Sequence, residues 1–251
     1  MVMRRLLKAL GILGLVALGF GLGALYSALK PAPLVLQQDA IVAGTTSSSV
    51  HSSLRANYLN ITPQDEVIST VFIFYPGGLV RPQAYEWLGV ALAPLGVRTI
   101  IAVMPLDLAV MAPNRADEIL EGLETSPNNI VIGGHSLGGA MAARYALKKP
   151  DKVDGLILMG AFSANSDDLS ENDIVTLVLA AENDGLATLA EVQEGMERLP
   201  DDATLEIIPG AVHSFFGRYG PQNNDGLPTV SRATAEATLT EVLKAYFLAL
   251  P

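Results

Sequence analysis

Short, β-rich apolar runs alternate with amphipathic helical segments along most of this chain, and this alternation restricts the fold more than any other feature. We expect strands at residues 71–75, 99–104, 129–132, 153–159, 174–181 and 204–208. We expect helices at about residues 85–95, 114–123, 138–147, 187–199 and 239–250. Such repeated alternation predicts an α/β fold, in which helices cover both faces of a mostly parallel sheet.

In a sheet of this kind, ligands bind beyond the carboxyl ends of the strands. Gly134-His135-Ser136-Leu137-Gly138 follows the third expected strand, opens the next helix and matches the pattern G-x-S-x-G. A serine at so tight a turn is presented at the edge of the sheet, beside the free N–H groups of the helix start. The pattern also arises by chance in glycine-rich chains, but its position between a buried strand and a helix favours Ser136 as a nucleophile.

A serine hydroxyl is a poor nucleophile until a base removes its proton, and that base is usually a histidine oriented by a carboxylate. His213 follows the last expected strand, and Asp184 lies in the polar loop after the preceding one. Glu182 is an alternative acid, although the Asp184-Gly185 turn lies further beyond the strand end. The order Ser136, Asp184, His213 is the one typical of this strand-to-helix serine.

The other histidines have structural interpretations. His135 is expected to pack beneath the turn, because its side chain leaves in another direction from that of Ser136. His51 lies in a polar region and is interpreted as solvated. No two histidines have a helical metal-binding spacing, and the chain has no cysteine, so neither a metal site nor any other cofactor is expected.

Backbone N–H groups are expected to stabilise an oxyanion next to Ser136. Pro76-Gly77-Gly78-Leu79 follows the first expected strand, and its glycines let the main chain approach a carbonyl oxygen closely. The candidate donors are the N–H of Leu137 together with that of Gly78 or Leu79. An ordinary Gly-Gly turn is the alternative interpretation.

With these residues together, the chain resembles the alpha/beta hydrolase superfamily, and within it the alpha/beta hydrolase fold-5 family related to dienelactone hydrolases. The resemblance covers about residues 67–250 and is carried by Tyr75-Pro76-Gly77-Gly78-Leu79-Val80, Met104-Pro105-Leu106, Gly133 to Ala140, Asn183-Asp184-Gly185, and His213 followed by Phe216-Gly217 and Tyr219-Gly220. It implies the α/β-hydrolase fold and a triad of Ser136, His213 and Asp184. Dienelactone hydrolases use a cysteine nucleophile, so their particular substrate is not implied.

We therefore expect a serine hydrolase that cleaves a carboxylic ester or thioester of a small-molecule acyl substrate through an acyl-enzyme. Alternatives are an acyltransferase with the same triad and a non-catalytic envelope binding protein, because fold alone does not establish activity. The short segment from Ala161 to Asp173 stands where related enzymes carry a helical cap, so no large cap domain is expected.

The N-terminal segment predicts one transmembrane helix. Residues 9–29 carry no charge, and about 20 apolar residues span a hydrocarbon core. Arg4, Arg5 and Lys8 precede this segment, which predicts a cytoplasmic N-terminus and an extracytoplasmic catalytic domain. A cleaved signal peptide, leaving a secreted protein, is the alternative, although the apolar run is long and the bulky Tyr26 stands at the candidate cleavage site.

The sequence divides into residues 1–30, a membrane anchor or signal peptide; 31–62, a tether with one or two edge strands; and 63–251, the hydrolase domain. Within the first part, Gly19 and Gly23 have a G-x-x-x-G spacing that permits a weak homodimer through the anchor helix. From residue 30 onward the chain has 13 basic and 26 acidic residues, a formal charge of −13. So acidic a surface repels phosphate backbones, and no nucleic-acid partner is expected.

Overall fold

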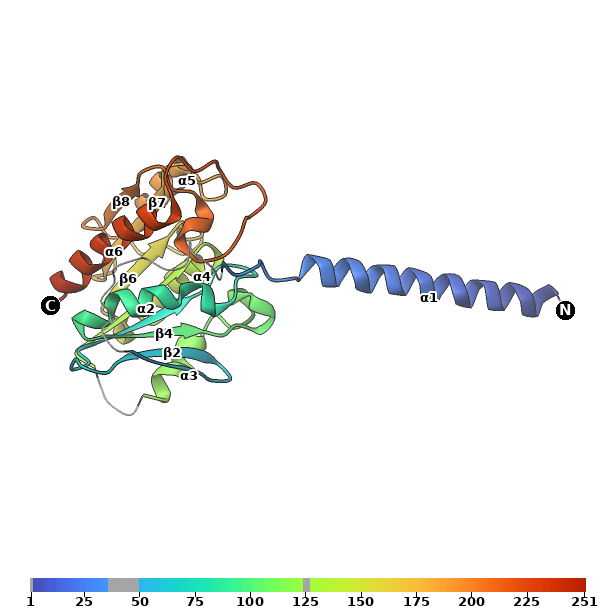
Figure 1. The fold of residues 1–251 in the computed structure, drawn as a ribbon, viewed down its shortest axis with the longest axis horizontal. Helices are drawn as coiled ribbons and strands as arrows, with labels where there is room; N and C mark the ends of the chain where they lie inside the picture. Colours follow the sequence, from blue (N-terminus) through green and yellow to red (C-terminus); the bar gives the residue numbers. More distant parts are fainter. Residues whose placement is uncertain (1, 36–49, 124–126) are drawn as a thin grey trace. The chain divides into compact units, whose positions relative to one another are not determined.

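The computed structural model describes residues 2–35, 50–123 and 127–251 (Figure 1). They divide into two units, Met1–Pro31 and Ala32–Pro251. The first unit contains the helix α1, Val2–Ala28. Residues 36–49 of the expected tether, including its polar run Thr45–Ser49, lie outside the described residues.

An eight-stranded sheet forms the centre of the second unit, in the order β1-β2-β4-β3-β5-β6-β7-β8. The six strands from β4 to β8 in this order are parallel, whereas β2 pairs antiparallel with both β4 and β1 at one edge. The strands are β1 Val50–Leu54, β2 Tyr58–Pro63, β3 Thr70–Tyr75, β4 Val97–Ala102, β5 Asn129–His135, β6 Gly155–Met159, β7 Val175–Ala181 and β8 Thr204–Ile208.

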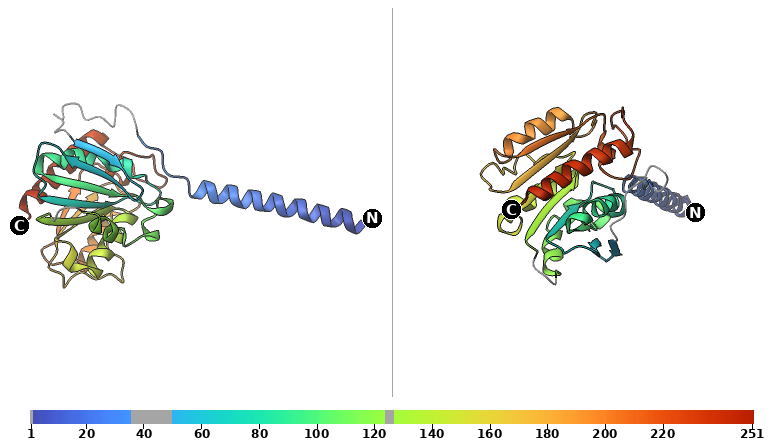
Figure 2. Two further views of the ribbon diagram at one scale, coloured as in Figure 1. Left: turned by 90° about the horizontal axis from the view of Figure 1, so that it is seen from below. Right: turned by 60° about the vertical axis from the view of Figure 1, so that its left-hand side comes forward.

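Helices cover both faces of this sheet, as the right-hand view of Figure 2 shows for the long C-terminal helix α6. The α-helices of this unit are α2 Glu86–Leu92, α3 Arg115–Glu121, α4 Leu137–Lys148, α5 Leu189–Gly195 and α6 Arg232–Ala249. One apolar core lies between the sheet and the helices α2 and α6, and the other lies between the sheet and α3, α4 and α5.

The central strand β3 shows how the sequence specifies two cores. All six of its side chains are buried, and successive side chains point to opposite faces. Phe72 and Phe74 belong to the core under α2 and α6, while Val71, Ile73 and Tyr75 belong to the other. A continuous apolar run is therefore required here, and the predicted α/β-hydrolase fold is confirmed.

The strand β5 extends three residues further than the sequence predicted. Gly133, Gly134 and His135 continue its parallel pairing with β6. A Cβ atom on Gly133 would lie 2.7 Å from the carbonyl oxygen of Ile157, so glycine allows close strand contact here rather than ending the strand. The extension brings Ser136 to the carboxyl edge of the sheet.

The same edge carries no large cap. Between β6 and β7 the described residues form turns and extended segments without an α-helix. This agrees with the absence of a cap domain predicted from the short segment Ala161–Asp173. The loops after the parallel strands therefore form the surface at this edge.

The helix α1 is long and apolar enough to cross a membrane. Its segment Leu10–Ala28 has 19 residues and a mean hydropathy of 1.9. At 1.5 Å per residue it extends about 28 Å, close to the thickness of a hydrocarbon core. A signal sequence near an N-terminus meets the same description, so the helix supports a membrane span or a signal anchor.

Candidate active site

Ser136 occupies the turn between β5 and α4 in a backbone conformation that is rare for a residue with a side chain. Its φ is 52° and its ψ is −123°. The turn is fixed on one side by the bond from the N–H of Ser136 to the carbonyl of Met159, 3.0 Å. The conformation is the strained one expected of a nucleophile at a strand-to-helix turn.

Small residues make this turn sterically feasible. A Cβ atom on Gly134 would lie 2.5 Å from the carbonyl carbon of Gly138. A Cβ atom on Gly138 would lie 2.1 Å from the carbonyl oxygen of Tyr75, at the end of β3. Both glycines of the G-x-S-x-G pattern are therefore required by the close approach of β5, α4 and the loop after β3.

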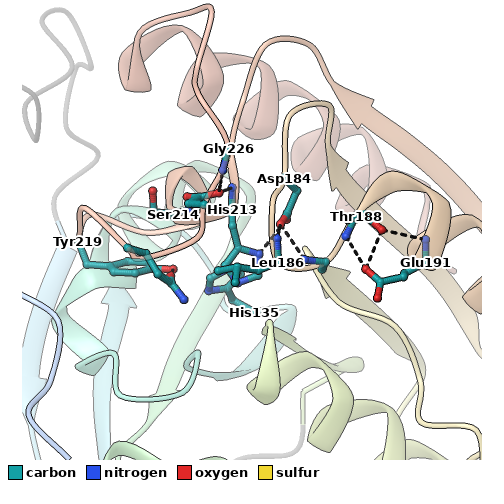
Figure 3. Close-up of polar contacts among 12 residues, drawn as sticks. His135, Asp184, Leu186, Thr188, Glu191, His213, Ser214, Tyr219 and Gly226 are labelled. Carbon is teal, nitrogen blue, oxygen red and sulfur yellow. Dashed lines mark hydrogen bonds and ion pairs between the residues drawn. The ribbon is translucent and has the colours of Figure 1, made fainter. Parts of the chain in front are cut away.

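Asp184 and His213 form a buried pair at the same edge of the sheet (Figure 3). The Nδ1 atom of His213 is 2.8 Å from Oδ2 of Asp184, and their side chains are only 1% and 0% exposed. The other carboxylate oxygen of Asp184 accepts N–H bonds from Leu186 and Ala187, both 2.8 Å. These donors fix the carboxylate so that one oxygen remains for the imidazole.

Glu182, the alternative acid, has a different role. Its Oε2 atom accepts a hydrogen bond from the N–H of Gly210, 2.7 Å. This bond ties the end of β7 to the turn that follows β8. Of the two candidate acids, Asp184 is the one that contacts His213.

The second ring nitrogen of His213, Nε2, takes no part in the contact with Asp184. Nε2 is buried, and within the described residues it has no hydrogen-bond partner. Because Nδ1 faces a carboxylate, Nε2 is the nitrogen left to accept a proton. No hydrogen bond joins Ser136 and His213 in the described part of the chain, although both follow strands at the same edge.

His135 packs beneath the turn, as the sequence predicted. It is fully buried, and its ring centroid lies 4.4 Å from that of His213. Its Nδ1 atom is 2.8 Å from the hydroxyl of Tyr85, which also accepts the N–H of Gly77 at 3.1 Å. The hydroxyl of Tyr85 therefore joins the loop after β3 to the imidazole of His135.

The pKa shifts of His135 and Tyr85 favour the neutral form of both side chains. Burial, and next the neighbouring His213, lower the pKa of His135 well below its usual 6.5, although the main chain of His213 acts in the opposite direction. Burial also raises the pKa of Tyr85. A neutral His135 adds no positive charge beside His213, and through Tyr85 it is hydrogen-bonded to the loop after β3.

Two of the three candidate oxyanion donors remain free to act. Leu137 is the first residue of α4, where an N–H has no carbonyl inside the helix to bond. The N–H of Gly78 has no hydrogen-bond acceptor among the described residues, and a Cβ atom on Gly78 would lie 3.3 Å from Cδ2 of Leu137. The prediction for Leu79 was wrong, because its N–H donates to the carbonyl of Asp107 at 2.7 Å.

Asp225 was missed by the sequence analysis. Its carboxylate accepts the N–H groups of His213 at 2.9 Å, Ser214 at 2.8 Å and Gly226 at 2.8 Å. It therefore fixes the start of the 3-10 helix His213–Phe216. Asp225 lies in a loop without periodicity, and only the turn-forming Asn224-Asp225-Gly226 marks it in the sequence.

Arg232, the first residue of α6, holds the rest of this segment. Its guanidinium donates to the carbonyls of Ser214 and Gly217 and, at 2.9 Å, to that of Tyr219. It also lies 4.6 Å from the ring centroid of Phe215. The segment from His213 to Tyr219 is therefore held in two ways. The carboxylate of Asp225 binds N–H groups at its start, and the guanidinium of Arg232 binds its carbonyls.

His51 lies on the edge strand β1 and is exposed, as expected of a solvated residue. Among the residues that the structure describes, no group of three or more His, Cys, Asp or Glu side chains is arranged to hold a metal ion.

Comparison with known proteins agrees with this architecture. A model of the alpha/beta hydrolase family matches residues 71–237, so the chain belongs to that family. The chain is also similar to a 1-acylglycerol-3-phosphate O-acyltransferase from Arabidopsis thaliana, with 52% identity over 46 residues. That match covers 18% of this chain and 11% of the plant protein.

Proposed function

We propose that this protein is a serine hydrolase that cleaves a carboxylic ester or thioester through a covalent acyl-enzyme. Ser136 is the nucleophile, His213 the general base and acid, and Asp184 the carboxylate that orients His213. The observation that carries the proposal is the buried pair of Asp184 and His213, whose second imidazole nitrogen has no hydrogen-bond partner among the described residues. Both residues follow strands at the edge where Ser136 adopts its strained turn.

In the first half of the reaction, the oxygen of Ser136 attacks the acyl carbon while Nε2 of His213 takes the hydroxyl proton. The tetrahedral intermediate places its negative oxygen against the N–H groups of Gly78 and Leu137. Its collapse breaks the bond to the alcohol or thiol, which leaves with the proton from His213. In the second half, His213 deprotonates a water molecule, which attacks the acyl carbon. The second tetrahedral intermediate then breaks its bond to Ser136, whose oxygen takes the proton back from His213 as the free acid leaves.

Asp184 stabilises the imidazolium that forms in both halves of this cycle. The N–H groups of Leu186 and Ala187 hold one of its oxygens, which leaves the other oxygen directed at His213. In this proposal the resting proton of His213 is on Nδ1, which donates to the carboxylate of Asp184 at 2.8 Å. The pair therefore supplies both the tautomer and the charge stabilisation that the base requires.

Hydrolysis of a short-chain nitrophenyl ester tests this proposal. We expect Ser136→Ala to lower kcat/KM by at least about 10⁴-fold, because the remaining activity would come only from binding and the oxyanion donors. The matched control is Ser214→Ala, which removes the hydroxyl adjacent to the base in sequence and should preserve most activity. Equal activity of wild type and Ser136→Ala would refute the nucleophile.

An acyltransferase is the second candidate, because the plant protein with a similar segment is named as one. It would use the same acyl-enzyme and transfer the acyl group to an alcohol rather than to water. Product analysis with glycerol and with a monoacylglycerol as competing acceptors separates the two. Hydrolysis is favoured if free acid remains the main product at saturating acceptor.

We further propose that α1 is an uncleaved anchor with a cytoplasmic N-terminus and an extracytoplasmic catalytic domain. The apolar segment Leu10–Ala28 and the basic residues that precede it support this topology. The chain has no cysteine, so Ala56→Cys, in the exposed turn between β1 and β2, gives a single labelling site. In right-side-out membrane vesicles an impermeant maleimide should label it; labelling only after lysis, or a soluble chain without α1, contradicts the topology.

A further inference from the structure

The chain enters the catalytic unit next to the proposed oxyanion donors. The N–H of Ala32 donates to the carbonyl of Leu79 at 2.9 Å, and Leu79 directly follows Gly78. Two residues later, Leu34 forms an antiparallel bridge with Tyr219, in the segment that follows His213. The first described residues of the catalytic unit thus lie against both loops of the active site.

Only three residues, Leu29, Lys30 and Pro31, separate Ala32 from the end of the apolar helix. The four Cα–Cα steps from Ala28 to Ala32 span at most about 14 Å when fully extended. The polar headgroup region on each side of a hydrocarbon core is roughly 5–8 Å thick. If α1 spans a membrane, the covalent chain alone therefore holds the loop at Leu79 close to the lipid surface.

The loop after β4 exposes apolar side chains at this same edge. Leu106 is 57% exposed, Val110 47% and Met111 57%; we call these three side chains the apolar rim. The rim adjoins the site, because the carbonyl of Asp107 accepts the N–H of Leu79. Asp107 is the only charged residue between Pro105 and Met111. Exposed apolar groups in one short segment are typical of a surface that meets a membrane or a partner.

We propose that the apolar rim contacts the bilayer that holds α1, and that the active site takes an ester glycerolipid from that bilayer as its substrate. The second part rests on the proposed hydrolase function. The short tether selects the lipid surface over other partners of the rim, since it keeps the adjoining loop within reach of the headgroups. Glycerolipid ester carbonyls lie at the boundary between headgroups and hydrocarbon, where the rim would rest.

Charge and topology narrow the substrate class further. The chain from residue 30 onward has a formal charge of −13, which opposes strongly anionic headgroups. A neutral or zwitterionic ester lipid is therefore expected. No α-helix lies between β6 and β7 to form a cap over this edge in the described residues, so the surrounding loops themselves would meet the lipid surface.

Depth measurement tests membrane contact without any assay of activity. Single cysteines are introduced by Met111→Cys and Val67→Cys into the full chain, labelled with an environment-sensitive fluorophore and reconstituted in phosphatidylcholine vesicles. Val67 is 88% exposed but precedes β3, at the opposite edge of the sheet, which makes it the matched control. We expect a blue shift and quenching by nitroxide lipids only at position 111. Equal responses at both positions would overturn the contact.

Activity on two substrates tests the lipid as substrate. Val110→Glu should lower hydrolysis of a diacylglycerol or phosphatidylcholine in the vesicles about tenfold, because a carboxylate enters the lipid surface poorly. It should leave hydrolysis of a water-soluble ester unchanged, and Val67→Glu should change neither rate. Equal loss on both substrates, or no loss on the lipid, would overturn the inference.

The two experiments also separate the inference from the function on which it depends. A wild type that inserts position 111 but cleaves no ester would refute the hydrolase and its lipid substrate, while membrane contact would stand. A wild type that cleaves the soluble ester while position 111 stays in water would refute the contact alone. Recovery of a chain without residues 1–28 from the native soluble fraction would overturn the contact as well, because the tether to α1 would be absent and the rim would not hold the protein at the bilayer.

Discussion

Asp225 offers the sharpest test of how this chain holds His213, the proposed base. Its two carboxylate oxygens accept the N–H groups of His213, Ser214 and Gly226. Asp225→Ala removes the acceptors of all three N–H groups at once. Among the described residues, however, Asp225 makes no hydrogen bond to the proposed nucleophile or to the imidazole ring. Its loss should therefore weaken the protein and misplace the base without removing any reacting group.

The magnitude follows from the burial of the donors. His213 and Ser214 are buried, at 1% and 5% exposed, so water replaces their lost acceptor poorly. Each buried donor left without a partner costs about 1–3 kcal/mol, and the less buried Gly226 should cost less. We expect Asp225→Ala to lower the free energy of unfolding by roughly 2–5 kcal/mol. A displacement of about 1 Å at the base would further lower kcat/KM by about 10²-fold.

Urea unfolding and ester hydrolysis at 25 °C measure the two effects separately. Asp201→Ala is the matched control, because Asp201 is exposed and makes no hydrogen bond among the described residues. Asp225→Asn keeps one acceptor oxygen and should fall between Asp225→Ala and wild type in both measurements. A variant Asp225→Ala with wild-type stability and wild-type kcat/KM would refute the positioning role.

Three further changes test the groups around the turn. Tyr85→Phe leaves the N–H of Gly77 and Nδ1 of His135 without partners and should cost about 2–4 kcal/mol in urea unfolding, with a lower kcat. Because the folded pKa of His135 is lowered, the unfolded chain binds a proton that the folded chain excludes, so stability should fall by up to about 1.4 kcal/mol per pH unit below about pH 6.5. His135→Asn should remove that part of the slope. Gly138→Ala should abolish soluble, active protein, since its Cβ would lie 2.1 Å from the carbonyl oxygen of Tyr75.

Matched variants give each of these results a reference. Tyr58→Phe removes a hydroxyl that makes no hydrogen bond among the described residues, and it should be nearly neutral. Gly122→Ala places a Cβ no closer than 3.5 Å to its neighbours and should be tolerated. A Tyr85→Phe protein as stable as Tyr58→Phe, an unchanged pH slope in His135→Asn, or a soluble and active Gly138→Ala protein would each contradict the contacts described for that residue.

The sheet and its active-site edge could be predicted from the sequence because burial on both faces leaves a strong pattern. Strands such as β3 must be apolar at every position, and this separates them from the amphipathic helices. Boundaries were less predictable. The strand β5 continues through Gly133 and Gly134, where local preference suggests an end. Contacts from β3 and β6 leave no room for a side chain at Gly133, and the start of α4 leaves none at Gly134.

The proposed triad illustrates which parts of a site local sequence reveals. Ser136 and His213 follow strand ends, so fold topology alone directs attention to them. Asp184 and Glu182 have similar sequence contexts, and only the coordinates distinguish the carboxylate at 2.8 Å from the imidazole from the one bound to Gly210. Glu182 and Asp184 lie only two residues apart, so the choice between the two carboxylates depended on the geometry of this turn.

Long-range contacts explain what the sequence analysis missed. Tyr85 reaches His135 across 50 positions, and Asp225 reaches back 12 positions to His213. The sequence makes Leu79 a plausible oxyanion donor, but in the structure its N–H donates to the carbonyl of Asp107 in the loop after β4. The contacts of each of these residues depend on the position of a second, irregular loop. Sequence periodicity does not predict that position.

Labelling by a fluorophosphonate, followed by peptide mass mapping, tests the central claim most directly. Wild-type protein should carry one adduct on Ser136, formed much faster than in Asp184→Asn or His213→Ala, and Ser136→Ala should remain unlabelled. An adduct on another serine, or a labelling rate that does not depend on His213, would contradict the proposed triad.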